Sequence, residues 1–170
     1  LNRHQNNLRL YKVNAQNAKS SLLLTETDKA YVDVHDNLTF LNDNSFIWTS
    51  EKDGYNHIYH YDANGKLKTQ ITNGDWEVTR YYGFNKEKNT IYYQSVENGS
   101  TNRGVYSIGL DGKNKKLLSN KVGSNSAAFS KNLNYFINTH STSEVPPIYS
   151  LYSGEGEMLK VIKDNADLKQ

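Results

Sequence analysis

The chain has 170 residues, a formal net charge of +2 and no cysteine. This length suits one ordinary domain with a buried core, and so small a charge does not indicate a nucleic acid or an anionic membrane as partner. Without cysteine the chain has neither disulfides nor thiolate metal ligands. No apolar stretch approaches the ~20 residues that a membrane-spanning helix needs.

The first predicted strand covers residues 8–15, where apolar and polar side chains alternate with a period of two. A turn at 14–19 leads to a second apolar run at 21–26. In the repeat described next, these two runs correspond to the third and fourth strands of a four-stranded unit. We therefore expect the chain to begin in the middle of such a unit.

The stretch from Phe40 to Leu118 contains the same pattern twice. Each copy has a Phe before a polar turn, a β-branched and aromatic run, a glycine-containing loop, a second run ending in a Gly turn, and a short last strand. A third copy opens at Phe129, so that Phe40, Phe84 and Phe129 follow one another at intervals of 44 and 45 residues. A repeat of roughly 40–50 residues that carries four strands is typical of β-propeller blades.

The predicted fold is therefore all-β, a β-propeller fragment of about three and a half four-stranded antiparallel blades. Its parts are a half blade of outer strands at 1–29, blades at 30–74, 75–121 and 122–164, and a tail or linker at 165–170. The inner strands are expected at 31–35, 76–82 and 124–129. Propellers close with typically 4–8 blades. We thus expect blades to be missing on both sides, and the exposed end faces to favour self-association or distorted packing.

Glycine turns support the strand predictions. Asn64-Gly65 is the pair favoured in type I′ hairpin turns, and Asp111-Gly112 is expected to serve the same role one blade later. In the third copy this place is taken by Gly154-Glu155-Gly156. Glycine recurs there because it adopts positive φ at little cost.

The sequence contains no motif of a catalytic site. A Gly-x-Ser-x-Gly elbow, a P-loop and a Gly-x-Gly-x-x-Gly fingerprint are all absent. His57 and His60 lie three residues apart on a predicted strand and point to opposite faces, which indicates sheet histidines rather than a metal pair. His35 and His140 are isolated and are interpreted as structural or exposed. We expect no catalytic residue, no metal site and no cofactor within this chain.

Two segments in order resemble the N-terminal propeller of the dipeptidyl peptidase IV family. In that family a Ser-x-x-x-Gly-Tyr-x-His-Ile segment is followed by Gly-x-Trp-Glu-Val at the start of the next blade. The matching residues here are Ser50, Gly54, Tyr55, His57 and Ile58, and then Gly74, Trp76, Glu77 and Val78. The likeness extends over nearly the whole chain from about Tyr31.

This resemblance implies a serine exopeptidase that removes dipeptides, preferably with proline or alanine second, from peptide N-termini. Its Ser-Asp-His triad would lie on an α/β-hydrolase domain after the propeller, and the chain also lacks the adjacent glutamates that bind the substrate's amino terminus. The propeller would gate peptide access to that domain. The resemblance implies the peptide substrate, the missing blades and the hydrolase domain as partners. Association between copies of the chain stays open as a further possibility. The parent protein would be periplasmic, secreted or at the cell surface.

The resemblance also suggests a substrate-facing segment. The family's inner strand that opens with an aromatic residue and Val lies near the extended substrate pocket, and Tyr31-Val32 matches this opening. The residues that follow depart from the family's vertebrate pattern. The candidates are Tyr31, Val32, Asp33 and His35, and the alternative is an ordinary inner strand.

A second class of function stays open at this point. Non-enzymatic propellers of the TolB-like or WD-like kind bind protein partners, and their blades also contain aromatic strands and Gly turns, so the repeat alone does not separate the two classes. The Gly-Tyr-x-His-Ile and Gly-Asp-Trp-Glu-Val segments favour the peptidase family.

Overall fold

The structure is a computed structural model, and it describes residues 1–168. Fourteen strands in this part of the chain form four antiparallel sheets, one of two strands and three of four strands. No α-helix occurs among residues 1–168, and the 3-10 turn η1 (Ala166–Leu168) follows the last strand. The all-β prediction is confirmed, and the strand numbers of the four sheets agree with three and a half four-stranded blades.

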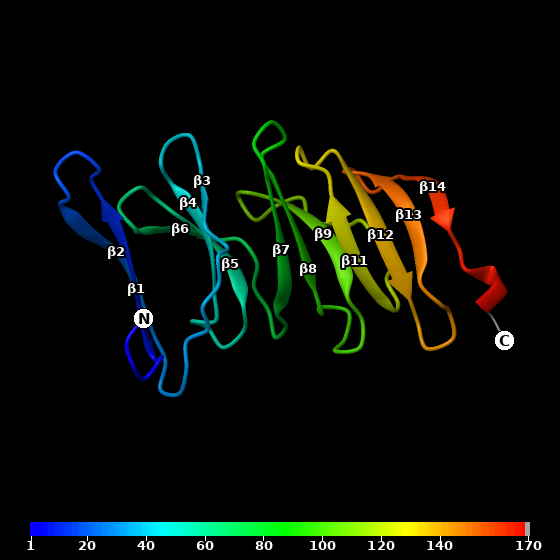
Figure 1. Ribbon diagram of the computed structural model, residues 1–170, viewed down its shortest axis with the longest axis horizontal. Coiled ribbons are helices and arrows are strands. Elements are labelled where there is room, and N and C mark those ends of the chain that lie inside the picture. Colours follow the sequence, from blue (N-terminus) through cyan, green and yellow to red (C-terminus); the bar gives the residue numbers. More distant parts are fainter. Residues whose placement is uncertain (169–170) are drawn as a thin grey trace. The chain divides into compact units, whose positions relative to one another are not determined.

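The chain divides into two compact units, Leu1–Thr72 and Asn73–Gln170. In the first unit β1 (Asn7–Val13) pairs with β2 (Ser20–Thr27), and a second sheet holds β3 (Thr39–Phe40), β4 (Phe46–Ser50), β5 (His57–Tyr61) and β6 (Leu67–Gln70). In the second unit one sheet holds β7 (Val78–Asn85), β8 (Thr90–Ser95), β9 (Gly104–Gly109) and β10 (Lys116–Leu117), and the other holds β11 (Ser124–Phe129), β12 (Tyr135–Ser141), β13 (Ile148–Ser153) and β14 (Met158–Lys163). Within each sheet every strand pairs with the next one along the chain (Figure 1).

The core of the first unit lies between its two sheets. Strands β4 and β5 have no exposed side chain, which explains why their sequences read as continuous runs rather than as strict alternation. The rings of Phe46 and Tyr61 stack with centroids 5.3 Å apart and planes at 12°. The buried cluster that joins the sheets contains Leu8, Leu24, Val32, Phe46, Trp48, Tyr59 and Tyr61.

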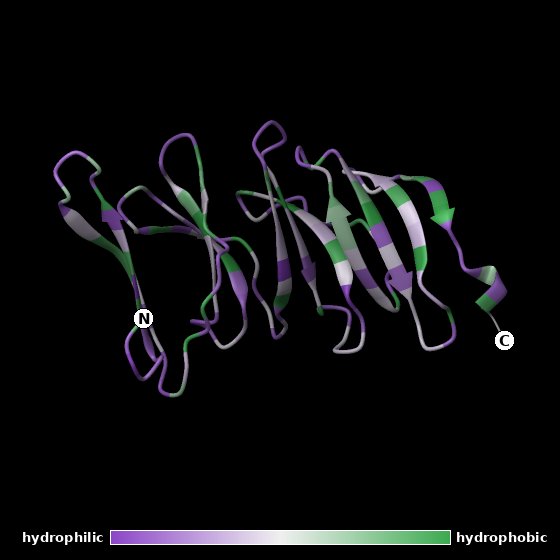
Figure 2. Ribbon diagram, viewed as in Figure 1, coloured by the Kyte–Doolittle hydropathy of each residue, from purple (hydrophilic) through white to green (hydrophobic). Residues whose placement is uncertain are grey.

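The core of the second unit also lies between its two sheets, and Phe129, the last of the three repeated phenylalanines, is partly buried and packs against it. Its ring centroid lies 5.1 Å from that of Tyr82, 4.9 Å from that of Tyr92 and 4.8 Å from that of Phe136. Such aromatic pairs add about 0.5–1.5 kcal/mol each beyond the area they bury. Figure 2 shows green, hydrophobic residues interspersed with white and purple ones along the strands of both units, while the hairpin turns are largely hydrophilic.

The prediction of an inner strand at 31–35 is wrong. The inner strand of the first complete sheet is β3, and residues 28–38 have no sheet pairing. Asp28 provides the physical reason, because its Oδ1 accepts hydrogen bonds from the backbone N–H groups of Ala30 (2.7 Å) and Tyr31 (3.2 Å) and thereby forms a turn. The N–H of Val32 then donates to the carbonyl oxygen of Gln5 (2.8 Å) instead of to a strand of the sheet. The other two inner strands are observed at 78–85 and, as predicted, at 124–129.

The turn at Asn64-Gly65 is not the predicted type I′ turn, which requires positive φ at both central residues. Only the glycine has positive φ, at 82°, and its N–H donates to the carbonyl of Asp62 (3.1 Å). This is a type I turn that ends in a G1 bulge. The Asp62 carboxylate favours it by accepting from the N–H groups of Asn64 (2.8 Å) and Lys66 (2.9 Å). The glycines at the equivalent place of the next two sheets also have positive φ: Gly112 (77°) and Gly156 (83°).

Substituting Gly65→Ala tests how tightly this turn meets the neighbouring sheet. A Cβ at this position would lie 1.7 Å from the carbonyl oxygen of Leu23 in β2, so the turn has to move away from that strand. Gly54 is the matched control, since it also has positive φ (101°) but open space around the position of its Cβ. We expect Gly54→Ala to lower the free energy of unfolding by about 1–2 kcal/mol from backbone strain alone, and Gly65→Ala to lower it by clearly more. Urea unfolding monitored by tryptophan fluorescence measures both, and equal losses would contradict the close contact.

Candidate functional site

The candidate residues lie in the connection from β2 to β3, at one end of the sheet β3–β6. In an antiparallel meander, alternate connections lie at opposite ends of the sheet, so this connection is at the same end as the β4–β5 loop at 51–56. The hydrogen bond between His35 and Thr49, near the end of β4, agrees with this placement.

His35 is held in one orientation by both of its ring nitrogens. Its Nε2 lies 2.8 Å from the carbonyl oxygen of Thr49, and because a carbonyl only accepts, Nε2 carries the proton. Its Nδ1 accepts from the backbone N–H of Asn37 (3.3 Å). The ring also packs on Trp48, with centroids 4.3 Å apart. His35 is therefore suited to form a fixed aromatic wall, and not to act as a general base or metal ligand.

Tyr31 and Asp33 are exposed beside it, while Val32 is not. The phenol oxygen of Tyr31 lies 3.4 Å from Oδ1 of Asp33, and that oxygen also accepts from the N–H of Val34 (2.9 Å). Val32 belongs to the buried cluster between the two sheets of the first unit. The structure thus places the exposed Tyr31 and Asp33 in the same segment as the half-buried His35, and it turns Val32 towards the core.

A polar cluster next to this segment was missed by the sequence analysis. The indole Nε1 of Trp48 donates to Oε1 of Glu26 (2.9 Å), which joins β4 to β2. The ammonium of Lys52 lies 3.9 Å from the centroid of the Tyr59 ring and donates to the hydroxyl of Tyr61 (3.0 Å). Cation–π contacts of this kind contribute about 0.5–2 kcal/mol. A partial signal was present in the sequence, where Tyr59 and Tyr61 are spaced to share one face of the strand.

Burial changes the ionisation of this cluster. It raises the pKa of Tyr61 to about 12, with the nearby carboxylate of Glu26 adding to the effect. Burial also lowers the pKa of Lys52, although Glu26 and Asp53 act in the opposite direction. Tyr61 is therefore a neutral hydroxyl at physiological pH, able to accept the hydrogen bond from Lys52.

The two histidines of β5 have separate partners. Nδ1 of His57 lies 3.1 Å from Oγ1 of Thr72, and Nε2 of His60 lies 2.9 Å from Oγ of Ser45. Burial lowers the pKa of His60. Within residues 1–168, no group of three or more His, Cys, Asp or Glu side chains is placed to hold a metal ion. Among the same residues, none forms a helix with the length and hydrophobicity that a bilayer crossing requires.

We expect Glu26→Ala to destabilise the first unit, because it leaves the indole N–H of the buried Trp48 without its acceptor. The loss of free energy of unfolding should be about 1–3 kcal/mol. Glu26→Gln keeps an acceptor oxygen and is the matched control, which should lose clearly less. Urea denaturation followed by tryptophan emission provides the comparison, and an unchanged midpoint for Glu26→Ala would show that this bond is not needed.

The comparison with protein families decides the family of this chain. The model of the dipeptidyl peptidase IV (DPP IV) N-terminal region matches residues 1–147. The chain belongs to this family. The four sheets are accordingly blades of a β-propeller, as the sequence predicted.

Individual relatives of the DPP IV N-terminal region agree with this assignment. The crystal structure of Porphyromonas gingivalis dipeptidyl peptidase 4 is similar with a TM-score of 0.88 and 39% identity, over 98% of this chain and 24% of that one. A probable dipeptidyl peptidase 4 of Aspergillus flavus is 32% identical over 71% of this chain and 16% of its own length. One from Arthroderma benhamiae is 29% identical over 96% of this chain and 22% of its own length. The chain thus spans about a fifth of the length of these two curated relatives.

Proposed function

We propose that this chain is the part of a dipeptidyl peptidase that controls how peptides reach a catalytic domain carried elsewhere in the same protein. The parent enzyme would remove Xaa-Pro and Xaa-Ala dipeptides from the N-termini of peptides. The observation that carries the proposal is the match of residues 1–147 to the DPP IV N-terminal region. The same match disfavours the alternative of a TolB-like or WD-like scaffold.

The construction of the blades supports a gating function. In each unit two sheets pack face to face through large buried aromatic side chains, and protein interiors packed in this way resist deformation. A rigid rim of this kind would limit entry to thin and flexible peptides, and it would exclude water from the reacting centre. The catalytic groups themselves would come from a hydrolase domain.

Tyr31, Asp33 and His35 are the residues that we propose to face the substrate. The fixed ring of His35 and the phenol of Tyr31 offer flat apolar surface, and the Asp33 carboxylate offers a negative charge. A peptide with a free N-terminus carries an ammonium group, which a nearby carboxylate attracts. Val32 is left out of the proposed contact surface because it lies in the core cluster.

The location of the parent protein is also a proposal. Relatives named dipeptidyl peptidase 4 support a peptide-processing role, and we infer a periplasmic, secreted or cell-surface enzyme from this likeness. The remaining blades of the propeller and the hydrolase domain would be its immediate partners, with association between copies as a further option.

An Xaa-Pro chromogenic dipeptide substrate tests the proposal that this chain controls access while another domain carries out catalysis. We expect the 170-residue chain to show no turnover above buffer, and the longer protein that contains it to show turnover that a serine-directed inhibitor abolishes. Inhibitor-sensitive activity of the chain itself would contradict the proposal. So would a coding sequence that continues after Gln170 without a Gly-x-Ser-x-Gly motif followed by Asp and His, because this would favour the scaffold.

The substrate contact is tested separately in the longer, active protein. We expect Tyr31→Ala combined with Asp33→Asn to raise KM for peptides about 3–10-fold with kcat nearly unchanged, since about 1 kcal/mol of ground-state binding is removed. Tyr135→Ala is the matched control, because Tyr135 is also an exposed tyrosine (52%) but lies in the other unit. Equal kinetic constants for the double variant and the control would show that the segment does not touch the substrate.

A further inference from the structure

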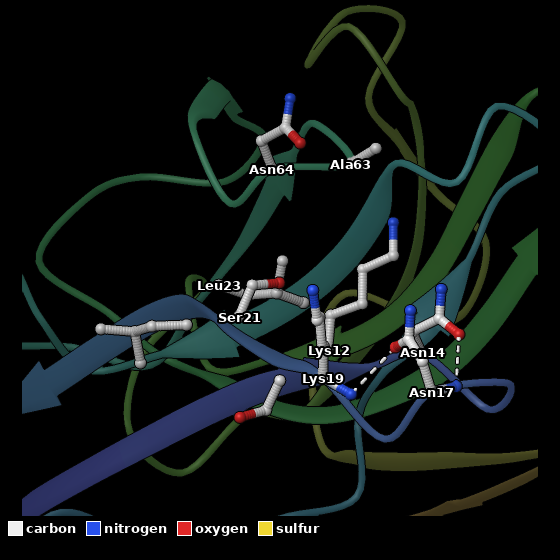
Figure 3. A pocket seen from close by; sticks show the side chains of 10 residues that line it. Lys12, Asn14, Asn17, Lys19, Ser21, Leu23, Ala63 and Asn64 are labelled. Carbon is white, nitrogen blue, oxygen red and sulfur yellow. Dashed lines mark hydrogen bonds between the residues drawn. The ribbon is translucent and has the colours of Figure 1, made fainter.

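A hollow of about 520 Å³ opens in the first unit between the β1–β2 hairpin and the β5–β6 turn (Figure 3). Successive connections in an antiparallel meander lie at alternate ends of the sheet, so the hollow lies at the opposite end of the sheets from Tyr31 and Asp33. Its lining residues are mostly polar and include Lys12, Lys19, Asn14, Asn17, Ser21 and Asn64.

A β-bulge borders this hollow. Leu10 pairs with Leu24, but the next residue of β1, Tyr11, pairs with Leu22, so that Leu23 is an extra residue in β2. Before the bulge, the β1–β2 sheet packs on the sheet β3–β6 through Leu8 and Leu24, which belong to the core cluster, and through Leu10, which packs against it. After it, Lys12 lies opposite Ser21 and both line the hollow. A bulge redirects side chains in this way.

The hollow is open to solvent, and a close backbone contact lies at the bulge beside it. Gly65 approaches the carbonyl of Leu23 so closely that no Cβ would fit between them. This contact fixes the distance between the β5–β6 turn, with Asn64, and the hairpin that carries the lysines. One side of the site is therefore set by the contact between Gly65 and Leu23, and the other side is the β1–β2 hairpin turn.

The hairpin presents hydrogen-bond donors to this space. Oδ1 of Asn14 accepts from the N–H groups of Gln16 (2.8 Å) and Asn17 (3.3 Å), and Oδ1 of Asn17 accepts from the N–H of Lys19 (3.0 Å). Both amide oxygens are therefore used to hold the turn. The Nδ2 groups of Asn14 and Asn17 have no hydrogen-bond acceptor within residues 1–168, and they are available to an external acceptor. Figure 3 shows these amides beside the lysine side chains, which extend towards the turn with Asn64.

The electrostatics of the hollow favour a negative charge. Neither Lys12 nor Lys19 forms an ion pair with a carboxylate in the described part of the chain, and no Asp or Glu is among the residues that line the hollow. Two ammonium groups therefore line the same space, and the carboxylate of Asp62 in the adjoining turn is held by the N–H groups of Asn64 and Lys66.

We propose that this hollow binds a small polar anion, in which a phosphate, sulfate or carboxylate group contacts Lys12 and Lys19 and hydroxyl groups contact the Asn and Ser side chains. The volume lies within the range of roughly 300–1,000 Å³ of small-molecule sites, which is larger than a single inorganic ion requires. Phosphorylated metabolites and acidic saccharides share this chemistry. The proposal is independent of the peptidase function, since it concerns other residues at the other end of the sheets.

The test is isothermal titration of the chain with three probes: inorganic pyrophosphate, a sulfated disaccharide, and the same disaccharide without sulfate. We expect saturable binding of at least one anionic probe, weakened by salt, and none of the neutral one. Tighter binding of pyrophosphate would indicate a phosphorylated ligand, and tighter binding of the sulfated disaccharide an acidic saccharide. Failure of both anionic probes, or equal binding of the neutral one, overturns the proposal.

The lysines are tested by the double variant K12Q/K19Q, which should weaken the binding of the anionic probe at least about 10-fold. The variant K121Q/K131Q removes the same charge from exposed lysines of the other unit and should bind as the parent chain does. Thermal unfolding verifies that both variants keep the fold. Equal loss of affinity in the two double variants would show only a general effect of net charge, and would overturn the proposed site.

Discussion

The packing of one sheet against the next is the constraint on which this structure depends. A four-stranded sheet alone leaves two faces in water, and here the central strands β4 and β5 have no exposed side chain. Each buried aromatic ring removes about 150–250 Å² from water, and at about 25 cal/mol per Å² this is several kcal/mol per ring. Within each unit, the second sheet covers one face of the first through a shared buried cluster. The polar groups at these faces need partners, and Glu26 provides one for the indole of Trp48.

The repeat could be predicted from the sequence because it is local in the chain. The phenylalanines and the Gly turns recur at fixed intervals, and they identified the sheets and the inner strand at 124–129. The failures depended on contacts between distant residues. Alternation at 31–35 resembled a strand, but a turn at Asp28 and a hydrogen bond from Val32 to Gln5 take that segment out of the sheet. The turn type at Gly65 was decided by the carboxylate of Asp62, which a dipeptide rule does not consider.

The candidate site was predictable only in part, for the same reason. Family resemblance pointed to the segment from Tyr31 to His35, but only the structure shows that Val32 belongs to the core and that both nitrogens of His35 are engaged. The hydrogen bond between Trp48 and Glu26 joins residues that are 22 positions apart and lie in different sheets. No period or motif of the sequence predicts this bond. A resemblance thus located the segment, whereas the function of each side chain depends on which neighbours the fold brings to it.

The second unit shows how a polar network replaces apolar packing at an inner strand. The sequence of β11 is rich in small residues, yet Asn125 in this strand is fully buried. Its Nδ2 donates to the carbonyls of Arg103 and Asn120 (both 2.9 Å), so its Oδ1 has to be the acceptor for Nδ2 of Asn138 and Nδ1 of His140 (both 3.1 Å). A slip of one residue would turn Asn125 to the other face and leave these buried groups without partners. The network therefore specifies the register of β11 and β12. Hydrophobic side chains of similar size would not do so, because they could replace one another in a shifted register.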